Sequence, residues 1–109
     1  MNNTNNLTNA ILRLLNLSGW KAWRNNTVGI WDANKGIYRR NKNTLKGVSD
    51  IIGFNRKTGQ FIGIEIKTGK DSISPEQILF LKEVNESGGI GMIARTFDQF
   101  YKDFQKVIA

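Results

Sequence analysis

The sequence predicts an α+β domain in which helices flank a β-sheet. Two observations indicate this: apolar residues alternate along residues 60–68 as in a strand, and they recur at helical spacing in three other segments. A chain of 109 residues without an internal repeat is suited to one domain with a modest core. We therefore expect residues 1–109 to form a single domain with the order helix, three or four strands, helix, strand, helix.

The first predicted helix covers about residues 5–17, where apolar side chains follow helical spacing until Gly19 ends the pattern. Residues 20–31 alternate aromatic and polar side chains, and residues 32–36 have the composition of a turn, so we expect a strand or a hairpin pair here. Residues 39–46 are polar, basic and without periodicity. This composition favours a loop that adapts to a nucleic-acid backbone.

The middle of the chain predicts an antiparallel hairpin. Residues 50–54 and 60–68 are apolar and strand-like, and residues 55–59 between them supply turn chemistry. A pair of strands joined by so short a turn is expected to lie side by side in the sheet.

Each of the two later helices begins with a capping-box pattern. Ser74 is followed by proline and then by Gln77, and Thr96 is followed three residues later by Gln99. Residues 90–94, between the two helices, are apolar and follow two glycines, which predicts a buried strand.

An acid and an acid-x-lysine pattern occupy the two strands of the predicted hairpin. Asp50 opens the first strand, and Glu65 and Lys67 follow fifteen and seventeen residues later. Because side chains alternate in a strand, the isoleucines around Glu65 face the core while Glu65 and Lys67 share the other face. Two acids on neighbouring strands form a hard oxygen site for a divalent cation, with an amine where water and phosphate would meet. This spacing indicates a metal-dependent nuclease.

Composition excludes several other classes of chemistry. The chain has no cysteine and no histidine, so disulfide frameworks, thiolate nucleophiles, the usual zinc sites and histidine acid-base catalysis are absent. No apolar run approaches the roughly 20 residues that span a bilayer, and the first residues are polar rather than signal-like. We therefore expect a soluble cytoplasmic protein without a membrane partner.

The net charge of +7 is concentrated in residues 20–57, which hold nine basic side chains and two acids. Such an excess is typical of a surface that binds nucleic acid, although it can also be a solubilising face. Charge and polarity make six residues the candidates for contacts with DNA, mainly with its phosphates. They are Arg24, Asn26, Arg39, Arg40, Lys42 and Lys46.

The candidate residues of the site also have ordinary structural explanations. Glu65 and Lys67 could form the solvated face of an edge strand, and Asp50 could cap a turn after Gly47. Gln77 is explained equally well by its place in the capping box and by a place near an active site. In the structural explanations these side chains lie apart, whereas in a site they lie close together.

The segments 47–50, 65–67 and 77, together with residues 23–26 and two glycines at 88–89, resemble the PD-(D/E)xK nuclease superfamily. Within it, the chain is most similar to the small stand-alone virus-type replication-repair nuclease (VRR-NUC) domains. The resemblance covers nearly the whole chain. It implies a restriction-endonuclease-like core, in which helices flank a central mixed sheet in the order α-β-β-β-α-β-α.

The resemblance also implies roles for individual residues. Asp50, Glu65 and the backbone carbonyl of Ile66 would bind Mg²⁺, for which Mn²⁺ can substitute, and Lys67 would position or activate the attacking water. Gln77 would lie near this catalytic group. The activity implied is endonucleolytic cleavage of DNA, chosen by shape or junction as in Holliday-junction resolvases, during replication, recombination or repair in a bacterial or phage-infected cell.

A four-way junction has two-fold symmetry, and a small core gains from a partner subunit, so we expect a homodimer. A monomer at micromolar concentration in light scattering would contradict this expectation.

Two positions depart from the family pattern. Ser49 occupies the place of the usual proline before the first aspartate, and Thr4 occupies the register in which relatives carry a metal-binding glutamate on the first helix. No acid occurs before Asp32. The alternative to an active nuclease is therefore a non-catalytic DNA-binding or assembly module that keeps the nuclease fold.

Overall fold

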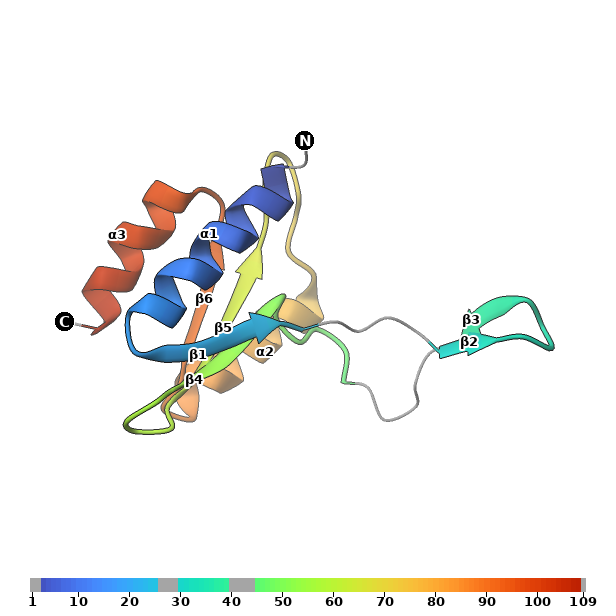
Figure 1. The fold of residues 1–109 in the computed structure, drawn as a ribbon, viewed down its shortest axis with the longest axis horizontal. Helices are drawn as coiled ribbons and strands as arrows, with labels where there is room; N and C mark the ends of the chain where they lie inside the picture. Colours follow the sequence, from blue (N-terminus) through green and yellow to red (C-terminus); the bar gives the residue numbers. More distant parts are fainter. Residues whose placement is uncertain (1–2, 26–29, 40–44, 109) are drawn as a thin grey trace.

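The computed structural model describes residues 3–25, 30–39 and 45–108, and within them it confirms the predicted α+β architecture (Figure 1). The helices and strands, in chain order, are α1 (Asn3–Leu17), β1 (Trp20–Arg24), β2 (Ile30–Asp32), β3 (Ile37–Arg39), β4 (Ile51–Asn55), β5 (Phe61–Ile66), α2 (Pro75–Glu86), β6 (Ile90–Ala94) and α3 (Phe97–Ile108). None of the described helices is both long and apolar enough to span a bilayer.

Four strands form the main sheet, in the order β1-β4-β5-β6. Strand β4 is antiparallel to both of its neighbours, β1 and β5, whereas β6 runs parallel to β5, so the sheet is mixed as expected. The predicted hairpin of β4 and β5 is confirmed, and its register pairs Ile51 with Ile64. One step further along the same register, Asp50 lies opposite Glu65.

The strand or hairpin pair expected for residues 20–31 and the turn at 32–36 is confirmed, as one strand followed by a separate hairpin. Strand β1 pairs with β4, thirty residues away in sequence, and the hairpin is formed by β2 and β3 around the turn that ends at Gly36. Figure 1 shows this hairpin extending away from the body that holds the main sheet. Alternation identifies a strand from local sequence, but the choice of partner depends on which neighbour can cover its buried residues, Trp20 and Ala22.

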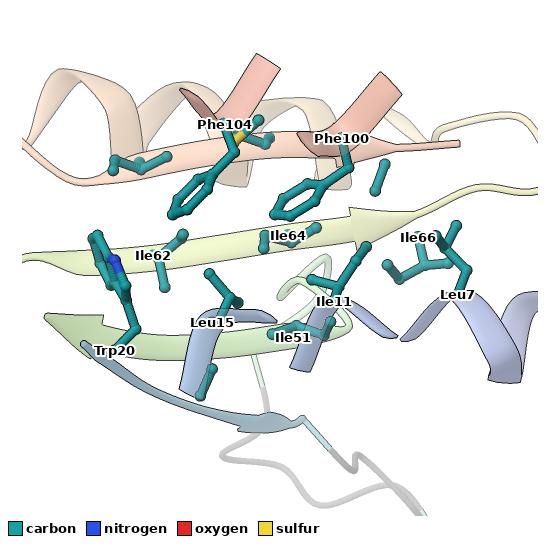
Figure 2. Packing of buried hydrophobic residues seen from close by; sticks show 14 residues of the cluster. Leu7, Ile11, Leu15, Trp20, Ile51, Ile62, Ile64, Ile66, Phe100 and Phe104 are labelled. Carbon is teal, nitrogen blue, oxygen red and sulfur yellow. The ribbon is translucent and has the colours of Figure 1, made fainter. Parts of the chain in front are cut away.

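The hydrophobic core lies between the sheet and the two helices α1 and α3 (Figure 2). The helical pattern of the first segment packs Ile11 and Leu15 inward, and Trp20 meets the ring of Phe104 edge-on at 6.1 Å. Helix α2 covers the opposite face of β5 and β6. Strand β5 is therefore buried on both faces, which places Glu65 inside the protein rather than on a solvated face.

Both predicted capping boxes are formed. The hydroxyl of Ser74 accepts a hydrogen bond from Gln77 N at 3.2 Å, and Gln77 Oε1 accepts one from Ser74 N at 2.8 Å. At the start of α3, Gln99 N donates to Thr96 Oγ1 at 3.1 Å. These caps satisfy helix N–H groups that have no partner within the helix, and the first cap fixes where α2 begins over β5.

Candidate active site

Asp50 stands at the entrance to β4 and is bonded to the far end of β5. Its Oδ2 accepts a hydrogen bond from the backbone N–H of Ile66 at 2.8 Å, while its own carbonyl accepts one from Asn25 N at 2.8 Å. The carboxylate is thus held against β5 rather than in a cap for the turn at Gly47. This contact ties three adjacent strands together at one end of the sheet.

Glu65 is the most unusual charged residue of the described chain, because its side chain is only 1% exposed. Oε1 accepts a hydrogen bond from Gln77 Nε2 at 2.8 Å, whereas the buried Oε2 has no hydrogen-bond partner among the described residues. The pKa of Glu65 is raised from 4.5 to about 8, first by burial and then by the neighbouring carboxyl group of Asp50, against the opposing charge of Lys67.

Gln77 performs both of the roles that the sequence left open. Its Oε1 closes the capping box with Ser74, and its Nε2 holds Glu65 at 2.8 Å. A side-chain amide has a separate acceptor and donor, so one group can cap the helix and orient the acid. The start of α2 is thereby coupled to the position of the Glu65 carboxylate.

Lys67 brings a positive charge to the same place. Its Nζ lies 3.9 Å from Glu65 Oε1, and its side chain is 15% exposed. Its backbone N–H donates to the carbonyl of Ala94 at 2.9 Å, which extends the pairing of β5 with β6 by one residue. The backbone of Lys67 is therefore fixed in the sheet, and most of its side chain is buried.

These groups line one open pocket of about 490 Å³. Helix α1 contributes Thr4 and Thr8 to its wall, and Thr4 Oγ1 forms a 2.5 Å hydrogen bond with Thr68 Oγ1. Among the described residues that line this pocket, the only acids are Asp50 and Glu65. The described residues that line it are Thr4, Thr8, Arg24, Asn25, Asp50, Glu65, Ile66, Lys67 and Gln77.

A model of the VRR-NUC domain matches residues 4–98. The chain belongs to the VRR-NUC family. VRR-NUC domains are of the PD-(D/E)xK nuclease type, and membership indicates a nuclease that acts on DNA. The matched segment contains all four strands of the main sheet and every residue of the pocket. No curated protein matches the sequence significantly.

The carboxyl groups of this VRR-NUC domain fit a divalent cation. Glu65 is buried beside the exposed carboxylate of Asp50, and its orphaned Oε2 and raised pKa both show that Lys67 alone does not compensate the negative charge of this pair. A hard cation between two acids would supply that compensation, with the Ile66 carbonyl as a further oxygen. Within the described ranges, no third Asp, Glu, His or Cys joins these two acids.

The predicted DNA-binding residues have different locations. Arg24 lines the pocket, and Lys46 is exposed outside it. Asn26, Arg40 and Lys42 lie outside the described residues of this VRR-NUC domain, and of Arg39 only the backbone is described.

Sequence reasoning did not single out Asn5 and Asn9. Their side chains bind Arg24, and the only sequence signal is their spacing of four residues on a polar helix face.

Gly47 fixes the approach of the Asp50 segment to α2. It has φ +83°, and a Cβ there would lie 2.5 Å from the carbonyl oxygen of Glu76 in the first turn of α2. We expect Gly47→Ala to lower the free energy of unfolding by about 2–4 kcal/mol. Gly59→Ala is the matched control, because Gly59 has φ +77° and open space around it, and should cost only about 1 kcal/mol. Urea unfolding measures both, and equal losses would contradict the proposed close approach.

Proposed function

We propose that this VRR-NUC domain is a metal-dependent endonuclease that hydrolyses phosphodiester bonds in DNA. The observation that carries the proposal is the juxtaposition of Asp50 and Glu65, which lie opposite each other in the β4–β5 register and line one open pocket beside the amine of Lys67. Two acids this close repel each other unless a proton or a cation compensates them. Protein folds rarely keep such an arrangement without a chemical use for it.

The two carboxylates and the Ile66 carbonyl would hold Mg²⁺, for which Mn²⁺ can substitute. When bound, such a cation withdraws charge from a phosphate oxygen and lowers the pKa of water. The protein orients the ligands: the Ile66 N–H holds Asp50, and the Gln77 amide holds Glu65. Both acids are therefore positioned before substrate arrives.

Lys67 is the residue proposed to act on the attacking water. Its amine stands within 3.9 Å of Glu65 and is partly exposed to the pocket, so it can hydrogen-bond to a water molecule. Its positive charge also offsets the negative charge that develops on the phosphate oxygens during attack.

The substrate is proposed to be recognised by shape. Exposed basic side chains lie on β1 and on the turn between β4 and β5, among them Lys21, Arg56 and Lys57. Contacts of lysine and arginine with phosphates position a duplex without reading its sequence. Binding of this kind does not depend on base sequence, and we propose branched DNA in replication, recombination or repair as the substrate. The homodimer expected for a two-fold symmetric junction stays a prediction.

A second function, a non-catalytic DNA-binding module, is favoured by one observation. Helix α1 presents Thr4 and Thr8 to the pocket, and neither can supply the negative charge of a metal-binding glutamate. Two carboxylates then have to supply all of the ligand charge.

The two functions are separated by incubating the purified protein with labelled four-way junction, flap, duplex and single-stranded DNA in Mg²⁺, Mn²⁺ or EDTA. We expect cleavage that requires the metal and is fastest on branched DNA. Lys67→Met should slow cleavage at least about 100-fold while leaving DNA binding in EDTA within a fewfold of the original.

Lys82→Met is the matched control, because Lys82 is an exposed lysine of α2 whose amine lies 3.8 Å from Glu86 Oε1. Its cleavage rate should be unchanged. Binding without cleavage of any substrate would establish the module instead. Neither binding nor cleavage would overturn the proposed function.

A further inference from the structure

Arg24, at the end of β1, is held at the pocket by two neutral side chains from α1. Its Nη2 donates hydrogen bonds to Asn5 Oδ1 at 2.6 Å and to Asn9 Oδ1 at 2.8 Å. Asn5 and Asn9 are four residues apart and so project from one face of the helix. Thr4 and Thr8, the preceding residue of each pair, line the pocket itself. One turn of α1 thus forms the pocket wall and anchors its arginine.

The chemistry of this anchor leaves the positive charge of Arg24 intact. Amide oxygens accept hydrogen bonds without carrying a charge, whereas a carboxylate would neutralise the guanidinium group. In the part of the chain that the structure describes, no carboxylate forms an ion pair with Arg24. Nη2 uses both of its hydrogens on the asparagines, and among the described residues no hydrogen bond uses the donors on Nε and Nη1, which can therefore serve another ligand.

We propose that Asn5 and Asn9 are positioning residues that hold Arg24 as a phosphate-binding group beside the reacting centre. This inference rests on the proposed nuclease function. The pocket contains two acids, Asp50 and Glu65, which would repel a DNA phosphate. A guanidinium group that is oriented but not neutralised attracts the phosphate and can bind two of its oxygens at once. Helix α1 therefore contributes to the site by orienting Arg24 of β1, rather than by supplying an acid of its own.

The test measures binding of a labelled four-way junction in EDTA between about 50 and 200 mM NaCl, where no cleavage interferes. Arg24→Ala should weaken binding roughly tenfold and lower the slope of log affinity against log salt by about one, the loss of one phosphate contact. Lys102→Ala is the control: it removes the same charge from α3, outside the pocket, and should leave the slope nearly unchanged.

A first change in α1, Asn9→Asp, distinguishes positioning of Arg24 from simple support of the fold. Asn9→Asp would form an ion pair with Arg24, so a structural role predicts equal or higher thermal stability and unchanged binding. Our proposal predicts the same stability but roughly tenfold weaker binding, because the charge of Arg24 is neutralised. Gln105→Glu on α3 is the control for the added negative charge and should bind normally.

The pair Asn5→Ala and Asn9→Ala adds no charge and completes a double-mutant cycle with Arg24→Ala. The two alanines together should weaken binding a fewfold in the original chain and have no effect once Arg24 is absent. If the original protein binds junction but all of these variants keep its affinity and salt slope, the inference alone is overturned. If the original protein neither binds nor cuts DNA, the proposed function fails and the inference fails with it.

Discussion

Asp50→Asn is expected to abolish metal-dependent cleavage and at the same time to stabilise the metal-free protein. The amide keeps the shape of the side chain and an oxygen that can accept the hydrogen bond from Ile66 N, now 2.8 Å long. It removes one of the two negative charges that would hold a cation, so cleavage should fall at least about 1000-fold.

The stability gain of Asp50→Asn has a separate cause. The negative charge of Asp50 helps to raise the pKa of Glu65, which means that the two ionised carboxylates repel each other. Removing one charge should raise the free energy of unfolding above pH 8 by about 1 kcal/mol, or roughly 4–8 °C in Tm. Asp98→Asn is the matched control: Asp98 is exposed and forms a surface ion pair with Lys102 at 3.1 Å, so both readouts should stay near their original values. Retained cleavage by Asp50→Asn would contradict the proposed role of Asp50.

The stability of the metal-free protein is expected to fall as the pH rises from about 4.5 to 8, because of Glu65. Its pKa is about 8 in the folded protein and 4.5 in the ordinary, solvated state. In this interval the folded chain holds a proton that the unfolded chain has released, so the contribution is fully present below pH 4.5 and is lost as the pH passes 8. Thermal unfolding across this range measures the slope, and Glu65→Gln should flatten it.

Divalent cations should reverse this trend. A cation binds the ionised carboxylates and competes with the proton on Glu65, so its stabilising effect should be larger at pH 8.5 than at pH 5.5. Mn²⁺ should raise Tm by several degrees at the higher pH and have little effect on Glu65→Gln. A shift that is equal at both pH values, or that survives in Glu65→Gln, would show that the cation binds elsewhere.

Several parts of the candidate site could be predicted because they depend on neighbours in sequence. The turn at residues 55–59 sets the β4–β5 register, which brings Asp50 opposite Glu65. The capping box at Ser74 sets the residue at which α2 begins, and therefore places Gln77 in its first turn. Alternation in β5 places Glu65 on the face away from the isoleucine core.

Other features could not be read from the sequence, because they depend on segments that meet only in the folded chain. The same acid-x-lysine pattern occurs on solvated strands, and Glu65 is buried only because α2 packs over that face. From the sequence, Gln77 could be a helix cap or a site residue. Only the tertiary structure shows that its amide nitrogen donates a hydrogen bond to Glu65. Asn5 and Asn9 look like any polar helix face until β1 brings Arg24 to them.

By itself, the sequence determined the helices and strands, the β4–β5 register and the residue types available for chemistry, since these follow from local propensity, turn chemistry and side-chain alternation. The tertiary structure alone decided that β1 joins β4, that Glu65 is desolvated beside Asp50, and that Arg24 is anchored without being neutralised. Burial and electrostatic coupling act through space, and the groups involved come from segments far apart in the chain.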